Sequence, residues 1–259
     1  MSENESLGTV FPSEPPKTLV ILVHGAWHGA WCWAALQNEL DALGIASLAV
    51  DLPGHGASTL PLGDMYGDAQ HVVDVAIKIG GPVVLVGHSY GGGVITEAAH
   101  RLGTYPHVQI RHLVYLTAFC VDEGESVGGL AAALPRQDTL LSGAMLPGPT
   151  MANGVATFVV DCDKARDAFY GQCLPEVSAA AVQRLSPQPV ATFGQPATGA
   201  PWKLIPSTYV VCERDNAIHP SHQRIMAARC DTVHSLDTDH SPFASMPQET
   251  ANIIAGIRA

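Results

Sequence analysis

The segment 82–93 constrains the fold more than any other part of the chain. It reads Pro-Val-Val-Leu-Val-Gly-His-Ser-Tyr-Gly-Gly-Gly, so an apolar run typical of a buried strand leads into a serine between glycines. Residues 94–102 then follow a helical pattern. A sharp strand-to-helix turn strains the backbone of its serine and exposes the hydroxyl, and a Cβ on either glycine of the motif would collide with neighbouring backbone. The segment therefore predicts a nucleophile elbow with Ser89 at its apex, followed by a helix whose N-terminus favours developing negative charge.

Strands and helices alternate along the rest of the chain. Further apolar runs typical of buried strands lie at 18–23 and 110–116, and other strand patterns lie at 45–50, 208–212 and 232–236. Helical patterns lie at 31–43, 68–79, 221–229 and 247–257. Because each strand is followed by a helical crossover, the sheet should be mostly parallel with helices on both faces, which is an α/β architecture.

The pattern changes between the strand at 110–116 and the strand at 208–212. This stretch carries glycine, proline, alanine and polar residues, with helical pieces at 164–170 and 175–185. It is typical of a mainly helical cap inserted into the core. The predicted organisation is a flexible N-terminal arm at 1–17, a core formed by 18–119 and 206–259, and a cap at 120–205.

Composition excludes several classes of partner. The chain has 259 residues, 47% hydrophobic and 14% charged, with a formal net charge of -11 and no basic run. This argues against binding of nucleic acid or anionic membranes. No apolar stretch is long enough to span a bilayer, and residues 1–17 lack the features of a signal peptide. A cytoplasmic protein is therefore expected, with a small molecule as its partner and a homodimer left open.

The six cysteines are scattered and form no Cys-x-x-Cys pair. In a chain of this size without a signal peptide, free thiols are expected. A bridge between Cys162 and Cys173 is the alternative.

A serine hydroxyl needs a base within hydrogen-bond reach, and that base needs an orienting acid. In a parallel sheet both lie on loops at the carboxyl ends of strands. The loop after 208–212 offers Asp215, and the loop after 232–236 offers His240. The order Ser89, Asp215, His240 is that of the α/β-hydrolase triad.

Other residues compete for these roles. The chain has 12 histidines, but only His240 follows the last strand on a loop. Asp122, after the strand that precedes the cap, and Glu213 are alternative acids. Asp237 and Asp239 are interpreted as loop or solvated residues.

A tetrahedral intermediate needs two N–H donors. We expect one from Tyr90, which follows the nucleophile, and the other from Ala26 in the first strand-end loop. His24 and His28 lie four residues apart, as metal ligands on a helix do, but here they flank a strand-to-loop turn. No metal or cofactor is expected.

These motifs resemble the α/β-hydrolases, and more narrowly the plant methylesterase and hydroxynitrile lyase family with its bacterial esterase relatives. The resemblance covers 18–258 and is carried by His24-Gly-Ala-Trp-His-Gly-Ala-Trp-Cys-Trp33, Asp51-Leu-Pro-Gly-His-Gly56, Gly87-His-Ser-Tyr-Gly-Gly92, Leu116-Thr-Ala-Phe119 and Val211-Cys-Glu-Arg-Asp215. The cap matches poorly.

The resemblance implies either ester hydrolysis or cyanohydrin cleavage on one triad. Lyases of this type carry a threonine where this chain has Gly25 and a lysine where it has Ser241. Gly25 leaves the oxyanion hole open, and Ser241 supplies no cation for leaving cyanide. Hydrolysis is therefore the preferred interpretation.

The predicted pocket residues are Trp27, Phe119 at the start of the cap, and Trp202 at its end. Few charges under a cap suggest a small or medium uncharged ester, and the resemblance implies a methyl or aryl ester. Lactone or carbamate hydrolysis would use the same machinery. The alternative to an enzyme is a ligand-binding protein of the same fold that has no catalytic activity.

Overall fold

The computed structural model describes residues 18–257, so the predicted N-terminal arm lies outside the described residues. At its centre is a six-stranded sheet in which every neighbouring pair is parallel. The strands, in sheet order, are β2 (Ser47–Val50), β1 (Leu19–Val23), β3 (Gly81–His88), β4 (Val108–Leu116), β8 (Ser207–Cys212) and β9 (Thr232–Leu236). The predicted parallel α/β sheet is confirmed.

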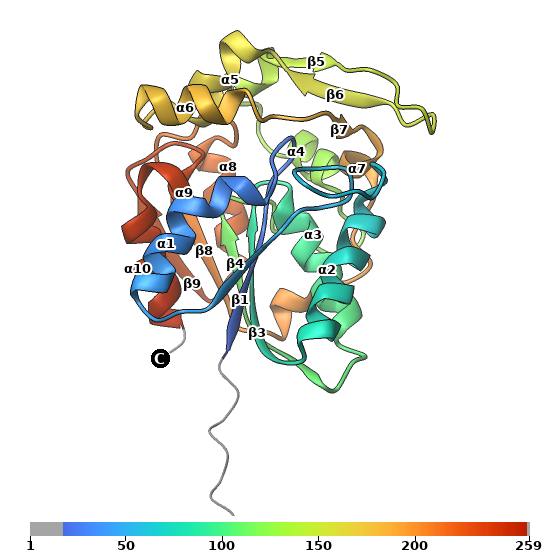
Figure 1. The fold of residues 1–259 in the computed structure, drawn as a ribbon, viewed down its shortest axis with the longest axis vertical. Helices are drawn as coiled ribbons and strands as arrows, with labels where there is room; N and C mark the ends of the chain where they lie inside the picture. The colour runs from blue at the N-terminus through green and yellow to red at the C-terminus, as the bar shows by residue number, and fades with distance from the viewer. Residues whose placement is uncertain (1–17, 258–259) are drawn as a thin grey trace, which may run out of the picture.

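Helices cover both faces of this sheet (Figure 1). On one side lie α1 (Ala34–Ala42) and α10 (Pro247–Ile257), and on the other lie α2 (Met65–Ile79) and α3 (Gly91–Leu102). The remaining core elements are η1 (Ala30–Trp33), α8 (Pro220–Ala227) and α9 (Pro242–Ser245). Burial on both faces explains why β1 and β3 read as continuous apolar runs rather than alternating patterns.

Helix α3 begins three residues earlier than its apolar pattern predicts, because glycines form its first turn. A Cβ on Gly91 would lie 2.6 Å from the carbonyl oxygens of Val23 and His24. Glycine therefore lets α3 start directly behind the elbow, against the end of β1.

The segment between β4 and β8 lies mostly over the carboxyl ends of the strands (Figure 1). It contains α4 (Val127–Ala133), η2 (Leu141–Gly143), α5 (Cys162–Phe169), α6 (Pro175–Val182), α7 (Ala191–Gly194) and η3 (Pro201–Lys203). It also contains an antiparallel sheet of β5 (Met145–Pro147), β6 (Thr157–Val160) and β7 (Gln188–Pro189). Strands of two to four residues are too short for an alternating pattern, so the sequence did not reveal this sheet.

The end of the predicted cap runs along the core helices. Gln195 Oε1 accepts a hydrogen bond from Met65 N at 2.7 Å, at the start of α2. Thr198 N donates to the buried carboxylate of Glu97, on α3, at 2.8 Å. The segment 195–205 is therefore fastened to α2 and α3 rather than placed above the sheet.

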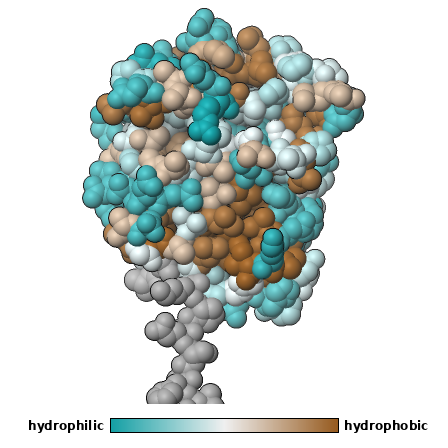
Figure 2. Space-filling model, viewed as in Figure 1, coloured by the Kyte–Doolittle hydropathy of each residue, from teal (hydrophilic) through white to brown (hydrophobic). Residues whose placement is uncertain are grey.

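Hydrophilic residues cover much of the face seen in Figure 2, and hydrophobic residues gather in its lower half. The edge strand β2 leaves Leu48 38% exposed. Among residues 18–257, no helix has both the length and the apolar character needed to cross a membrane. All six cysteines are free, so the alternative bridge between Cys162 and Cys173 is absent.

Candidate active site

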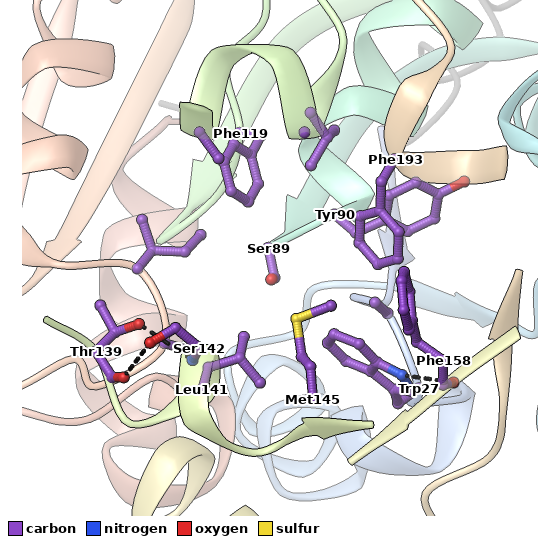
Figure 3. Close-up of a pocket in the computed structure, with 16 residues that line it drawn as sticks. Trp27, Ser89, Tyr90, Phe119, Thr139, Leu141, Ser142, Met145, Phe158 and Phe193 are labelled. Atoms are coloured by element: carbon purple, nitrogen blue, oxygen red, sulfur yellow. Dashed lines mark hydrogen bonds between the residues drawn. The ribbon is translucent and has the colours of Figure 1, made fainter. Parts of the chain in front are cut away.

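Ser89 lies at the apex of the turn between β3 and α3, and its hydroxyl faces a cavity (Figure 3). Its φ of 53° is in the left-handed region, as the sequence predicts for an elbow. A Cβ on Gly87 would meet the carbonyl oxygen of Gly91 at 2.5 Å. The two glycines are thus required by the close approach of the two arms of the turn.

Left-handed backbone outside glycine gathers in this region of the described structure. Within residues 18–257 the non-glycine residues with positive φ are Trp27, Ser89 and Thr117. Each conformation costs about 1–2 kcal/mol, and strain of this kind gathers at functional sites. One follows β1, one follows β3 and one follows β4, so three neighbouring strand ends share the strain.

His240 and Asp215 are brought together from the loops after β9 and β8. His240 Nδ1 lies 2.7 Å from Asp215 Oδ2, and both side chains are buried. Because Nδ1 donates to the carboxylate, Nε2 is left to act as a base. The carboxylate also accepts hydrogen bonds from Thr117 Oγ1, Gln223 Nε2 and the amides of Ala217 and Ile218. These donors satisfy a charge that burial would otherwise make costly.

His88 joins the loop of His240 to the elbow. Its Nε2 lies 2.7 Å from the carbonyl oxygen of His240, and the two rings are 4.6 Å apart. Burial lowers the pKa of His88, with the neighbouring His240 acting in the same direction. The ring is therefore neutral and donates through Nε2–H, which joins the loop of His240 to the residue that precedes Ser89. Sequence reasoning did not single out His88, because the motif leaves this position free.

The alternative acids lie elsewhere. Asp122 is partly exposed and pairs with Lys203 at 2.5 Å, which lowers its pKa. Glu213 pairs with Arg224 at 2.5 Å. Of the three acids considered, Asp215 alone contacts His240.

The two amides predicted to bind an oxyanion border the same cavity. Ala26 and Tyr90 both line it, next to Ser89. Within residues 18–257, neither backbone N–H donates to another residue. Both amides are therefore free to bind a ligand oxygen, as the prediction for the oxyanion hole requires.

The cavity has a volume of about 310 Å³, and its walls are mostly apolar (Figure 3). The lining residues are Ala26, Trp27, Ser89, Tyr90, Phe119, Val127, Gly128, Ala131, Thr139, Leu141, Ser142, Met145, Phe158, Phe193, Ala217 and Ile218. None of these carries a charge. Among the lining residues, Ala131 and Ser142 are exposed, whereas Trp27 and Tyr90 are buried.

Trp27 and Phe119 line this cavity as predicted, but Trp202 does not. The indole of Trp202 donates to Val121 O at 2.8 Å and lies under the cations of Lys203 and Arg229. Its segment follows the core helices, which carries the side chain away from the site.

Asp239 is a loop residue, as predicted, but it is buried rather than solvated. It is 2% exposed, and its carboxylate accepts hydrogen bonds from Gln172 N at 2.7 Å and from Ser241 N and Ser245 Oγ. Asp237 is exposed and pairs with Arg214, as predicted. A loop has no regular hydrophobic pattern, so the sequence could not show which of these two carboxylates is buried.

His24 and His28 are not arranged as metal ligands. His24 Nδ1 lies 2.8 Å from Gly25 O, and its Nε2 accepts from Leu52 N. His28 Nδ1 lies 2.7 Å from Ala26 O, and its Nε2 lies 2.6 Å from Tyr170 Oη. All four ring nitrogens are engaged in hydrogen bonds that shape the first loop.

Comparison with known proteins identifies the family of this chain. The family model described as "Alpha/beta hydrolase family" matches residues 20–253. The chain belongs to the alpha/beta hydrolase family. This hydrolase is 32% identical to an alpha/beta hydrolase of Aspergillus novofumigatus, over 92% of this chain and 95% of that protein. It is 30% identical to methylesterase 18 of Arabidopsis thaliana, over 88% and 92%.

Among solved structures, this hydrolase is similar to a pyrethroid hydrolase from Sphingobium faniae, with a TM-score of 0.79 and 27% identity over 94% of this chain and 98% of that one. The predicted resemblance to the plant methylesterases is confirmed, and so is the predicted fold class.

Proposed function

We propose that this protein is a serine carboxylesterase that hydrolyses small or medium uncharged esters. The observation that carries the proposal is a strained serine beside two free backbone amides at one apolar cavity. The paired His240 and Asp215 are joined to this elbow through the hydrogen bond between His88 and the carbonyl of His240. The similarity to proteins named hydrolase and methylesterase supports the same reaction class.

In the proposed reaction, Ser89 Oγ bonds to the ester carbonyl carbon while its proton passes to His240 Nε2. The amides of Ala26 and Tyr90 bind the oxygen that becomes negative, and Asp215 stabilises the charged imidazole. The intermediate then expels the alcohol oxygen, which takes the proton from Nε2. Water attacks the acyl-enzyme, giving its proton to His240, and release of the acid returns a proton to Ser89.

The cavity argues for the class of substrate. A charged acid or alcohol would lose its hydration in a cavity whose lining carries no charge, so neutral substrates are favoured. The aromatic wall formed by Trp27, Tyr90, Phe158 and Phe193 suits an apolar or aryl group. A methyl or aryl ester of such an acid is the proposed substrate.

Cyanohydrin cleavage is disfavoured by two residues. A Cβ on Gly25 would lie 2.9 Å from Ser89 Cβ, so the backbone beside the nucleophile leaves no room for the threonine that a lyase carries. Ser241 is buried and uncharged beside His240, so no cation is supplied there for leaving cyanide.

The test compares the wild type with Ser89→Ala on p-nitrophenyl esters, aryl methyl esters and mandelonitrile. We expect ester turnover that falls by at least about a thousandfold in the variant. Labelling by a fluorophosphonate gives a second measurement that does not depend on the choice of ester. Retained turnover in Ser89→Ala would refute the proposal, and cleavage of mandelonitrile alone would replace it with a lyase.

A further inference from the structure

Trp27 follows Ala26, whose N–H is the predicted oxyanion donor, and its polar groups are bonded to the cap. Trp27 N donates to Gln188 Oε1 at 3.1 Å, and Trp27 O accepts from Ser186 N at 2.9 Å. The indole Nε1 donates to Phe158 O at 3.1 Å. Every polar group of Trp27 is thus bonded to a residue between β4 and β8, although Trp27 itself belongs to the loop after β1.

The peptide unit between Ala26 and Trp27 is fixed at both ends. Its carbonyl oxygen lies 2.7 Å from Nδ1 of the buried His28, and its N–H is bound by Gln188. Trp27 has a φ of 65°, a conformation that a tryptophan adopts only when its surroundings impose it. With this peptide fixed, the preceding amide, Ala26 N–H, remains free at the cavity.

Gln188 is built to act as an acceptor at this point. It is fully buried on β7, and its Nε2 donates to Thr192 Oγ1 at 3.0 Å. The hydroxyl of Thr192 donates in turn to Pro189 O at 2.6 Å, so Oγ1 can only accept from Gln188. The amide orientation is therefore determined, with Oε1 directed at Trp27.

We propose that Gln188 is a positioning residue for the oxyanion hole: by accepting from Trp27 N it holds the left-handed turn that keeps Ala26 N–H directed at the developing oxyanion. The inference rests on the proposed esterase function. It makes the cap a part of the catalytic machinery as well as a cover, because a residue of the cap sets the geometry of a loop in the core.

The test uses Gln188→Met, which keeps the length of the side chain and removes both hydrogen bonds. Gln183→Leu, an exposed change in the same stretch of the cap, is the matched control. We expect kcat to fall about 10- to 100-fold in Gln188→Met, with KM within about threefold, because one oxyanion donor is misplaced rather than removed. The affinity for a trifluoromethyl ketone, which places an oxyanion in the hole, should fall by the same factor.

If Gln188 had only a structural role, Gln188→Met would lower thermal stability. The ratio of its affinity for the ketone to its affinity for the product would then equal that of the wild type. That result, or a kcat equal to wild type, would overturn the inference while the esterase proposal stands. Should Gln188→Met not fold, Gln188→Asn is the second variant, because it keeps the amide but shortens the side chain by one methylene. We expect a smaller fall of kcat and of ketone affinity in this variant. If fluorophosphonate fails to label Ser89 in the wild type, the proposed function itself is wrong.

Discussion

At the scale of single residues, the site depends on positions where the side chain and the backbone are both constrained. Thr117 illustrates this. It is held at a φ of 40°, and its hydroxyl donates to Asp215 Oδ2 at 2.5 Å. The same carboxylate oxygen receives His240 Nδ1. Thr117 therefore fixes the carboxylate oxygen that orients the proposed base. A single threonine after a strand gives no indication of this role in the sequence.

Thr117→Val keeps the branched shape and removes the donor, so we expect kcat for ester hydrolysis to fall by about tenfold or more, since a hydrogen bond to a charged group is worth about 1.5–3 kcal/mol. Thr117→Ser keeps the hydroxyl and should retain most of the activity. Steady-state kinetics on both variants check this, and equal rates in Thr117→Val and the wild type would contradict it.

Gly25 is required because a side chain would not fit at this position, and not because of its backbone conformation. A Cβ there would lie 2.9 Å from Ser89 Cβ and from His88 Nδ1. Gly25→Ala should therefore displace the elbow and lower kcat/KM by at least about tenfold. Gly63, where an added Cβ meets nothing within 4 Å, offers the control Gly63→Ala, which is expected to behave as wild type.

At the scale of elements, the end of α5 is joined to the loop of the proposed base. Phe169, the last residue of α5, packs its ring 5.7 Å from that of His240. Three residues later, Gln172 N donates to the buried Asp239. Asp239 precedes His240 directly, so one carboxylate links the cap to the base. The cap thus contacts two loops of the proposed active site, one through Gln188 and the other through Gln172.

Asp239→Ala should destabilise the fold by about 2–4 kcal/mol, because it leaves the part-buried amide of Gln172 and the buried amide of Ser241 without an acceptor. Asp237→Ala, two residues away and exposed, should leave the unfolding midpoint unchanged. Urea denaturation of the two variants measures the difference. Similar midpoints for both would show that Asp239 contributes no more than a surface residue.

At the scale of the whole molecule, several histidines are buried and neutral around the first loop. Burial lowers the pKa of His28 and of His55 to about 4. Their ordinary value is 6.5, so between pH 6.5 and pH 4 the unfolded chain binds protons that the folded chain does not. This part of the stability is complete above pH 6.5 and is lost as the pH falls towards 4.

His55→Gln removes one such group, because glutamine does not titrate. Between pH 6 and pH 5 the free energy of unfolding of the variant should fall less steeply than that of the wild type, by about 1.4 kcal/mol per pH unit. Denaturant titrations at both pH values provide the slopes. Parallel slopes would mean that His55 is protonated in the folded protein.

The alternation of strands and helices, the elbow and the order of Ser89, Asp215 and His240 could all be predicted from the amino-acid sequence. These features are local: an apolar run predicts a buried strand, and a glycine-flanked serine predicts a strained turn. The carboxyl ends of parallel strands meet at one edge of the sheet, so placing residues after strands also placed them near each other.

The polar residues that support these groups could not be identified before the folded structure was known. Thr117, His88, Gln188 and Asp239 act through partners 67 or more residues away in sequence, or across the interface between cap and core. Trp202 was misplaced for the same reason, because its segment is held by Glu97 and α2 rather than by the cap. Such contacts depend on packing of distant segments, and no local pattern encodes them.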